Sequence, residues 1–223
     1  MTALVVANGS PPSAACARRW HQQADLLVAA DGGLEHCLAW GLTPDLLIGD
    51  LDSVGGEAME ALRRAGGQVQ EHPPRKDAND LELALLAVAE AGHKQVIILA
   101  GVGGRWDQSL ASFLLLANER FAGLQIALAD DRQWATLVRP GRSLELPGEL
   151  GHTVSLLPLG ASASGITTKG LAYPLDQGEL SLGSSRGISN VIHALPATVT
   201  IQQGLLLCLV DQAADGPLAP RGG

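Results

Sequence analysis

The sequence predicts an α/β fold class: an N-terminal parallel-sheet, Rossmann-like domain followed by an antiparallel β-sandwich domain. Up to about residue 130, short apolar runs alternate with amphipathic segments, which is typical of β-α-β units. Beyond that point, Gly and Pro turns separate the apolar runs. A length of 223 residues allows two modest domains, and we expect them at 1–132 and 133–212, with a flexible tail at 213–223.

The elements of the first domain follow from apolar runs and helix boundaries. Strands are expected where the apolar run is short and continuous: residues 4–6, 26–28, 46–48, around 69, 96–99 and 126–128. Helices are expected where apolar positions recur with the helical period: 13–23, 34–40, 57–64, 80–91 and 109–118. Asn79 and Glu82 predict a capping box for the fourth helix. Continuous apolar strands joined by helices predict a parallel sheet covered on both faces.

The second domain has the pattern of short strands joined by tight turns. We expect strands at 135–138, 143–146, 154–157, 165–168, 179–182, 198–202 and 205–210. Strands of this length and spacing, without helical segments between them, predict an antiparallel sandwich or barrel.

Composition and charge exclude several classes of protein. The chain is 46% hydrophobic and 17% charged, which excludes a disordered protein. Its formal net charge of −8 argues against a nucleic-acid partner. The apolar runs are too short for a signal or membrane-spanning segment, so we expect a cytoplasmic protein with no membrane partner. Cys16, Cys37 and Cys208 lack disulfide or zinc spacing and are expected to be buried thiols.

Acidic and glycine-rich segments follow four of the predicted strands. They are Asp31-Gly32-Gly33, Gly49-Asp50-Leu51-Asp52-Ser53, Lys76-Asp77-Ala78-Asn79-Asp80 and Gly101-Val102-Gly103-Gly104-Arg105-Trp106-Asp107. Because ligands of open parallel sheets bind outside the carboxyl ends of the strands, we expect these segments to converge. In an extended segment Asp50 and Asp52 would point the same way, as hard oxygen ligands for Mg²⁺, with Asp80 as a third ligand.

Most of these residues also have a structural interpretation. Asp31, Asp77 and Asp107 could each be a helix N-cap, and the glycine pairs could be tight turns. The acid pair at 50 and 52 favours function, because like charges at one strand end repel each other. Gly103-Gly104-Arg105 could hold a phosphate group, since glycine amides are accessible and a guanidinium binds phosphate with two hydrogen bonds.

Together with Gly187-Ile188-Ser189-Asn190 downstream, these segments resemble the ordered motifs of the thiamine pyrophosphokinase family. The resemblance spans about residues 3–210. It implies an α/β catalytic domain that binds ATP, a β-sandwich domain that binds thiamine, and Mg²⁺ as cofactor. It also implies a homodimer whose active sites lie where the two kinds of domain meet across subunits. The implied reaction transfers the diphosphoryl group of ATP to the hydroxyl of thiamine, giving thiamine diphosphate and AMP.

The resemblance further implies a role for each motif residue. Asp50, Asp52 and Asp80 would be the catalytic metal ligands. The residues around the nucleotide would be Asp31, Gly32, Gly33, Gly104, Arg105 and Asp107. Ser189 and Asn190 would hydrogen-bond thiamine. The cationic thiazolium ring of thiamine would favour an aromatic face, and Tyr173 is the only aromatic residue after Trp134.

Other functions are compatible with parts of this pattern. A diphosphokinase acting on a pterin-like alcohol would have the same metal site with a different second domain. A non-catalytic binder of thiamine or nucleotide would keep the fold without the reaction. A phosphatase with Asp50 as nucleophile would place its Asp-x-Asp pair after the first strand, whereas here the pair follows the third predicted strand.

Overall fold

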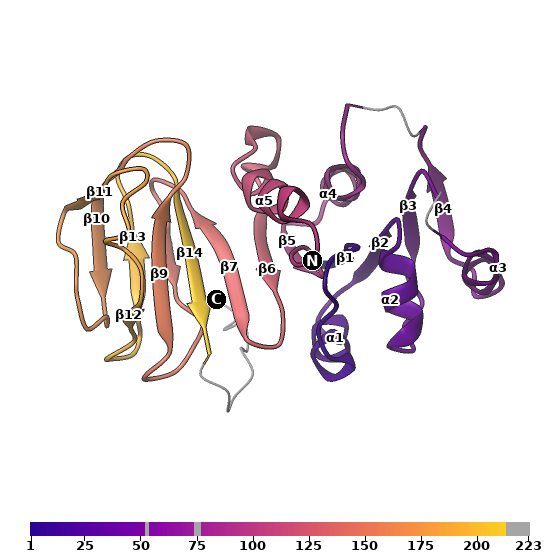
Figure 1. Ribbon diagram of the computed structural model, residues 1–223, viewed down its shortest axis with the longest axis horizontal. Helices are drawn as coiled ribbons and strands as arrows, with labels where there is room; N and C mark the ends of the chain where they lie inside the picture. Colours follow the sequence, from indigo (N-terminus) through magenta and orange to yellow (C-terminus); the bar gives the residue numbers. More distant parts are fainter. Residues whose placement is uncertain (52–53, 74–76, 213–223) are drawn as a thin grey trace. The chain divides into compact units, whose positions relative to one another are not determined.

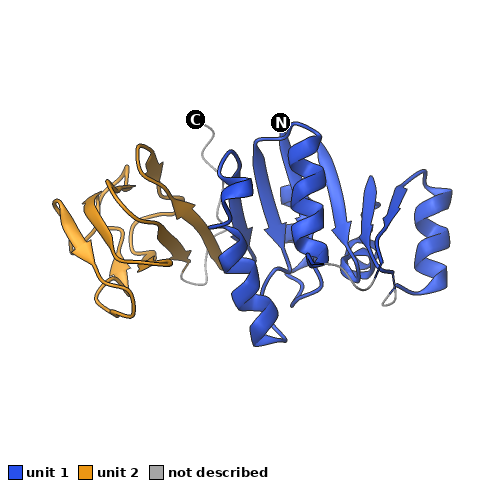
Figure 2. Cartoon of the chain, turned by 90° about the horizontal axis from the view of Figure 1, so that it is seen from above, with its two compact units in different colours: residues 1–130 blue, residues 131–223 orange. Residues whose placement is uncertain are grey.

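The computed structural model describes residues 1–51, 54–73 and 77–212. The chain divides into two compact units, residues 1–130 and 131–223 (Figure 2). Unit 1 is an α/β unit built on a parallel sheet, and unit 2 consists of antiparallel strands, so the expected fold class is confirmed. Among the described residues, no helix combines the length and apolar character needed to cross a lipid bilayer.

The sheet of unit 1 has the strand order β6-β5-β1-β2-β3-β4, and every neighbouring pair is parallel. Its strands are β1 (Thr2–Val6), β2 (Leu26–Ala30), β3 (Leu46–Gly49), β4 (Gln68–Glu71), β5 (Gln95–Leu99) and β6 (Gln125–Ala129). Successive strands β1 to β4 advance in one direction, and β5 and β6 then extend the sheet from the other side of β1. The order in which strands are added to the sheet therefore reverses at β1, and the topological switch point lies between β1 and β5.

Helices cover both faces of this sheet (Figure 1). They are α1 (Ala14–His21), α2 (Gly33–Ala39), α3 (Gly56–Arg64), α4 (Asp80–Glu90), α5 (Trp106–Leu115) and the 3₁₀ turn η1 (Glu119–Phe121). α2 packs on β1 and β2, and α4 packs on β1, β2 and β3. The interior strands are almost fully buried, as the continuous apolar runs require, and Trp20 and Trp40 are buried with them.

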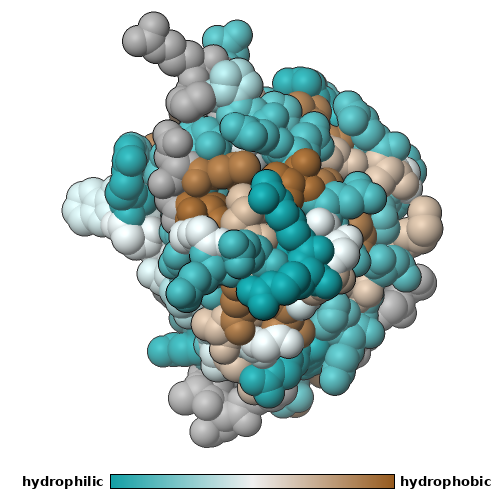
Figure 3. Space-filling model, turned by 90° about the vertical axis from the view of Figure 1, so that its right-hand side faces the viewer, coloured by the Kyte–Doolittle hydropathy of each residue, from teal (hydrophilic) through white to brown (hydrophobic). Residues whose placement is uncertain are grey.

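The edge strand β4 is chemically different from the strands inside the sheet. Its exposed residues are Gln68, Gln70 and Glu71, and the neighbouring α3 exposes charged side chains such as Glu60 and Arg64. The side of unit 1 that carries α3 and β4 is accordingly largely hydrophilic, with hydrophobic residues in smaller patches (Figure 3). Polar side chains on an edge strand disfavour pairing with the strand of another molecule.

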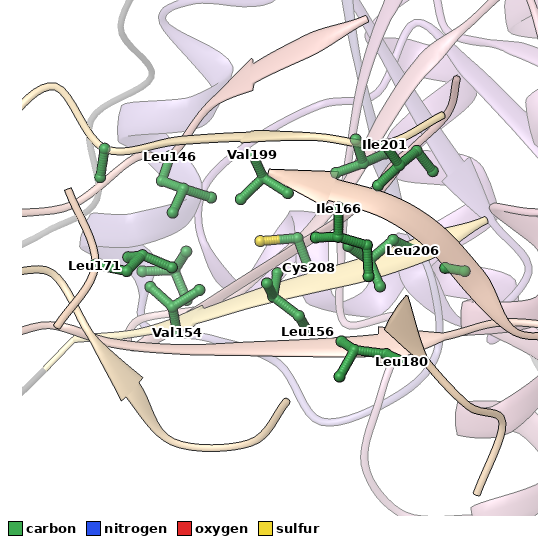
Figure 4. Packing of buried hydrophobic residues seen from close by; sticks show 14 of the residues in the cluster. Leu146, Val154, Leu156, Ile166, Leu171, Leu180, Val199, Ile201, Leu206 and Cys208 are labelled. Carbon is green, nitrogen blue, oxygen red and sulfur yellow. The ribbon is translucent and has the colours of Figure 1, made fainter. Parts of the chain in front are cut away.

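Unit 2 is a sandwich of two antiparallel sheets. One has the order β12-β9-β14-β7 and the other β11-β10-β13-β8. The strands are β7 (Gln133–Val138), β8 (Ser143–Glu145), β9 (Thr153–Pro158), β10 (Ala163–Lys169), β11 (Gly178–Leu180), β12 (Asn190–Val191), β13 (Thr198–Thr200) and β14 (Leu206–Asp211). Side chains of β9 and β14, including Leu156 and Cys208, meet side chains such as Ile166 and Val199 from the other sheet (Figure 4). The core thus lies between the two sheets.

Two features of the elements differ from the sequence-based expectation. α5 begins at Trp106 instead of residue 109, because Arg105 takes an extended backbone conformation and serves as the N-cap. Trp106 is 90% exposed, so it does not belong to the core. The two-residue strand β12 was not expected, since its pairing with β9 depends on contacts distant in sequence.

Candidate functional site

The loops after three strands of unit 1 share an unusual backbone conformation. Asp31 after β2, Leu51 after β3 and Ala100 after β5 have φ values of 48°, 64° and 52°. Non-glycine residues rarely adopt this left-handed region, where each costs on the order of 1 kcal/mol. All three lie at the carboxyl edge of the parallel sheet, where this class of fold binds ligands.

Asp31 and Asp50 are brought together at this edge by strand pairing. The Asp31 N–H donates to the carbonyl oxygen of Ile48 at 2.7 Å, which extends the pairing of β2 with β3. A Cβ at Gly49 would lie 3.1 Å from the Cα and Cβ of Asp31, so Gly49 permits this close approach. Asp50 follows Gly49 directly, and two acidic residues therefore follow adjacent strand ends.

The expected same-side arrangement of Asp50 and Asp52 is not supported by the backbone between them. The argument required an extended segment, but Leu51 is left-handed with a φ of 64°, so strand alternation ends at Gly49. Asp52 itself lies outside the described residues.

Asp80 is the first residue of α4, the helix that packs on β1, β2 and β3. Asn79 caps this helix, since its Oδ1 accepts the N–H of Glu82 at 2.8 Å. The predicted cap is confirmed. Among the described residues, however, the Glu82 carboxylate does not accept the Asn79 N–H, which a complete capping box would require. The Glu82 carboxylate instead lies 3.3 Å from Arg120 Nη1. Helix capping therefore falls to Asn79 and not to Asp80.

The loop after β5 carries an exposed ion pair. Arg105 Nε and Nη2 donate to Asp107 Oδ1 and Oδ2 at 3.1 and 2.5 Å, and the two side chains are 73% and 65% exposed. The hydrogen bonds from Arg105 lower the pKa of Asp107, and the same contact raises the pKa of Arg105. Ser109 orders the loop, because its hydroxyl accepts the Gly103 N–H and donates to the Arg105 carbonyl oxygen, both at 3.0 Å.

The three helix-cap interpretations of the acids are wrong. Gly32 and not Asp31 is the N-cap of α2, and Asn79 and not Asp77 is the N-cap of α4. Asp107 lies inside α5, where it pairs with Arg105. None of these three acids is therefore the N-cap residue of its helix.

Carboxylate oxygens at the edge of this sheet match the chemistry of a Mg²⁺ site, because Mg²⁺ prefers hard oxygen ligands. Within residues 1–51, 54–73 and 77–212, no three His, Cys, Asp or Glu side chains cluster closely enough to hold a metal ion. The described donors, Asp50 and Asp80, fit the ion by type, and Asp52 is the remaining candidate from the sequence.

The candidate thiamine residues lie in unit 2. Ser189 is left-handed with a φ of 61°, and its N–H donates to Ser155 Oγ at 3.2 Å. Asn190 Oδ1 accepts the Tyr173 N–H at 3.0 Å, and Asn190 Nδ2 donates to the Tyr173 carbonyl oxygen at 2.7 Å. The Asn190 side chain therefore fixes the backbone of Tyr173, which is 73% exposed. One Asn190 amide hydrogen is left over after these bonds.

One segment at the same edge of the unit 1 sheet escaped the sequence reasoning. Asn8, Gly9 and Ser10 follow β1 and lie between the loops after β2 and β5: a Cβ at Gly32 would meet the Asn8 amide, and one at Gly9 would lie 2.5 Å from the Ala100 carbonyl oxygen. The sequence does contain a sign of this segment. Asn8-Gly9-Ser10 directly follows an apolar run, and loops at the carboxyl ends of parallel strands are where ligands bind.

The chain matches two family models in succession. Residues 17–128 match the model described as the catalytic domain of thiamin pyrophosphokinase, and residues 143–206 match the model of its vitamin B1 binding domain. A thiamine pyrophosphokinase of Bacillus subtilis (strain 168) is 27% identical over 184 residues, which cover 82% of this chain and 86% of that protein. Thiamine pyrophosphokinase 1 of Oryza sativa subsp. japonica is 26% identical over 172 residues, which cover 73% of this chain and 64% of the rice protein.

Solved structures agree with these matches. The crystal structure of a Bacillus subtilis thiamine pyrophosphokinase superimposes with a TM-score of 0.83 at 25% identity, covering 96% of this chain and all of that one. The Candida albicans thiamin pyrophosphokinase superimposes with a TM-score of 0.79 at 16% identity, covering 94% of this chain and 88% of that one, which shows the same fold. Both similarities extend over the two units.

Proposed function

This chain belongs to the thiamin pyrophosphokinase family and is a thiamine diphosphokinase, and from this premise we propose how its residues divide the work. The reaction transfers the diphosphoryl group of ATP to the hydroxyl of thiamine and releases AMP. The observation that carries this function is the succession of the two family models along one chain, at 17–128 and 143–206. The second model also disfavours a pterin-like substrate and a phosphatase.

We propose that residues 1–132 form the catalytic domain and that Asp50, Asp52 and Asp80 hold Mg²⁺ there. A bound Mg²⁺ would neutralise phosphate charge and fix the geometry of the triphosphate. Asp50 follows β3, and Asp80 begins a helix that packs on β3, so both come from elements in mutual contact. Asn79 and not Asp80 supplies the helix cap, so capping is not the role of the Asp80 carboxylate.

The nucleotide is proposed to bind along Asp31, Gly32, Gly33, Gly104, Arg105 and Asp107. Arg105 is already held in a two-point hydrogen bond by Asp107, which presents its guanidinium in a defined orientation. A phosphate group bears more negative charge than a carboxylate and accepts the same pair of N–H groups. ATP would therefore take over part of the Arg105 donor set from Asp107.

The β-sandwich at 133–212 is proposed to bind thiamine through Ser189 and Asn190, with Tyr173 as its aromatic contact. The left-handed backbone at Ser189 costs free energy and is retained next to Asn190, as is common at binding sites. Asn190 orders the backbone of Tyr173, and the exposed ring of Tyr173 offers a face to a cation.

The chemical step consists of an attack by the thiamine hydroxyl oxygen on the β-phosphorus of ATP while the bond to AMP breaks. Because the transition state of phosphoryl transfer is loose, the residues act mainly by alignment and charge neutralisation. Arg105 would stabilise phosphate oxygens, and an Asp carboxylate at the sheet edge would accept the hydroxyl proton.

We further propose that the enzyme is a cytoplasmic homodimer with active sites at the subunit interface. Three free, buried cysteines suit a reducing compartment in which ATP is available. α5 exposes an apolar stripe of Trp106, Leu110 and Leu114 at helical spacing, the kind of surface that an interface covers. Light scattering that gives the mass of a single chain, 23.1 kDa, in solution would exclude the dimer.

Product analysis tests the function. The purified protein is incubated with ATP, Mg²⁺ and thiamine, and the products are separated by chromatography. We expect AMP and thiamine diphosphate in equal amounts. ADP with thiamine monophosphate, free phosphate alone, or no turnover would contradict the assignment.

A further inference from the structure

The loop Asn8-Gly9-Ser10 follows β1 and faces the loop after β5, so it lies at the topological switch point of the unit 1 sheet. In open α/β sheets, the two loops that diverge at this point form the sides of the ligand crevice. The residues assigned above to the nucleotide come from the loops after β2 and β5. Nothing has yet been assigned to the loop between them.

Three hydrogen bonds hold this loop in place. The Gly9 N–H donates to the Ala100 carbonyl oxygen at 2.7 Å, and the Ser10 N–H donates to the Val102 carbonyl oxygen at 2.8 Å. His36 Nε2 on α2 lies 3.1 Å from the Gly9 carbonyl oxygen, to which it donates. The loop backbone is thus tied both to the β5 loop and to α2, and its side chains start from a fixed framework.

The two polar side chains of this loop are exposed and lie against glycines of the neighbouring loops. A Cβ at Gly32 would come within 2.5 Å of Asn8 Nδ2, and a Cβ at Gly103 would overlap Ser10 Oγ. In the described part of the chain, neither the Asn8 amide nor the Ser10 hydroxyl hydrogen-bonds to another protein group. Two neutral donors therefore stand between the Asp31 turn and the Gly103–Arg105 segment, available to a ligand.

We propose that Asn8 and Ser10 bind the polyphosphate chain of the nucleotide, an inference that rests on the proposed function. Carboxylates at this edge, such as Asp31, repel phosphate oxygens unless a cation lies between them. Amide and hydroxyl donors attract phosphate oxygens without that requirement. Asn8 and Ser10 thus continue the phosphate-binding surface from Arg105 across β1.

The test is a calorimetric titration without thiamine, so that no turnover occurs. Wild type, Asn8→Ala, Asn8→Asp and Ser10→Ala are titrated with ATP in the presence of Mg²⁺ and, separately, with adenosine. Gln125→Glu is the matched control: it makes the same neutral-to-acid change at an exposed residue that begins β6, at the opposite edge of the sheet. Thermal melting shows which variants are folded.

We expect Asn8→Ala to raise the Kd for ATP about tenfold, because a hydrogen bond to a charged group is lost. Asn8→Asp should raise it about a hundredfold, since a negative charge replaces the donor. Ser10→Ala should raise it severalfold, and adenosine binding and the Gln125→Glu variant should match wild type.

An Asn8→Asp protein that binds ATP within twofold of wild type would overturn the inference, as would an equal loss of adenosine binding. If Asn8→Asp does not fold, the Asn8→Ala titration decides by the same criteria. If the wild type forms thiamine diphosphate and both Asn8 variants bind ATP as tightly as the wild type, only this inference is refuted. A wild type that binds no ATP would refute the proposed function with it.

Discussion

Arg105 and Asp107 hold each other through two hydrogen bonds although both side chains are mostly exposed. An exposed ion pair adds little to folding stability, so a substitution here can change ligand binding without a large change in stability. The planar guanidinium can exchange a carboxylate for a phosphate without moving far. Arg105 is therefore the residue at which the proposed nucleotide site can be tested most directly.

Replacing Arg105 by Lys should separate charge from geometry. Lys keeps the positive charge but cannot form the two-point hydrogen bond, so we expect the KM for ATP to rise about tenfold with little change in stability. Steady-state kinetics with varied ATP measures this effect. Arg64→Lys is the control, because Arg64 is also exposed and pairs with Glu60 on α3 at 3.8 Å. Equal KM values for both variants would remove Arg105 from the nucleotide site.

Tyr173 provides a second test at the residue scale. If its ring packs on the cationic part of thiamine, Tyr173→Phe should keep the KM for thiamine within about threefold, while Tyr173→Ala should raise it about tenfold. The KM for ATP should stay unchanged in both variants. A loss with Phe as large as that with Ala would assign the role to the hydroxyl group instead of the ring.

From the sequence, chemical roles can be predicted for single residues, whereas the backbone geometry around them cannot. Residue types and order pointed to Asp31, Asp50, Asp80 and Arg105. The sequence could not show the left-handed backbone at Leu51 or the bonds from Asn190 to Tyr173, because both depend on contacts made after folding. Asp107 was read as a possible cap because sequence spacing does not reveal that the helix begins at Trp106.

At the start of α4, the residue that caps the helix, Asn79, lies next to the proposed metal ligand, Asp80. Asn79 satisfies the N-terminus of the helix, while Asp80 begins a helix that packs on three strands of the sheet. Substitutions at these two neighbouring positions can therefore test stability and catalysis separately. The strands around this helix were predictable, because a parallel sheet buried on both faces requires continuous apolar runs.

Substitution of Asn79 should lower stability, whereas substitution of Asp80 should lower the reaction rate. We expect Asn79→Ala to lower the free energy of unfolding by about 1 kcal/mol, since a capping bond is lost. Asp80→Asn should instead lower kcat by at least about a hundredfold with a small change in stability. Denaturation curves and steady-state rates are measured on both. Glu90→Gln at the exposed end of the same helix is the control and should behave as wild type. A normal rate for Asp80→Asn at saturating Mg²⁺ would remove Asp80 from the site.

At the scale of the whole molecule, each of the two units contains one thiol that is fully buried. Cys37 and Cys208 are both 0% exposed, in units 1 and 2 respectively. Burial raises the pKa of the Cys37 thiol from 9.0 to about 12 and raises the pKa of Cys208 as well. Both therefore remain neutral in the folded protein at physiological pH, as expected for thiols that only fill space.

The buried thiols should weaken the fold at alkaline pH. Between pH 9 and 12 the Cys37 thiol ionises in the unfolded chain but not in the folded one, so the unfolded chain binds fewer protons and stability falls as pH rises. We expect Cys37→Ala to remove roughly 1.4 kcal/mol per pH unit of this decline. Chemical denaturation at pH 7, 8, 9.5 and 10.5 measures it. The difference between wild type and variant should be constant from pH 7 to 8, and a constant difference up to pH 10.5 would contradict the account.

In the proposed reaction, both terminal phosphorus atoms of ATP move together to thiamine. The most direct measurement uses ATP labelled at the β-phosphorus, with thiamine and Mg²⁺, and follows the label into the separated products. We expect all transferred label in thiamine diphosphate, and we expect the released AMP to be unlabelled. Label retained in ADP, with thiamine monophosphate as product, would show transfer of a single phosphoryl group and would contradict it.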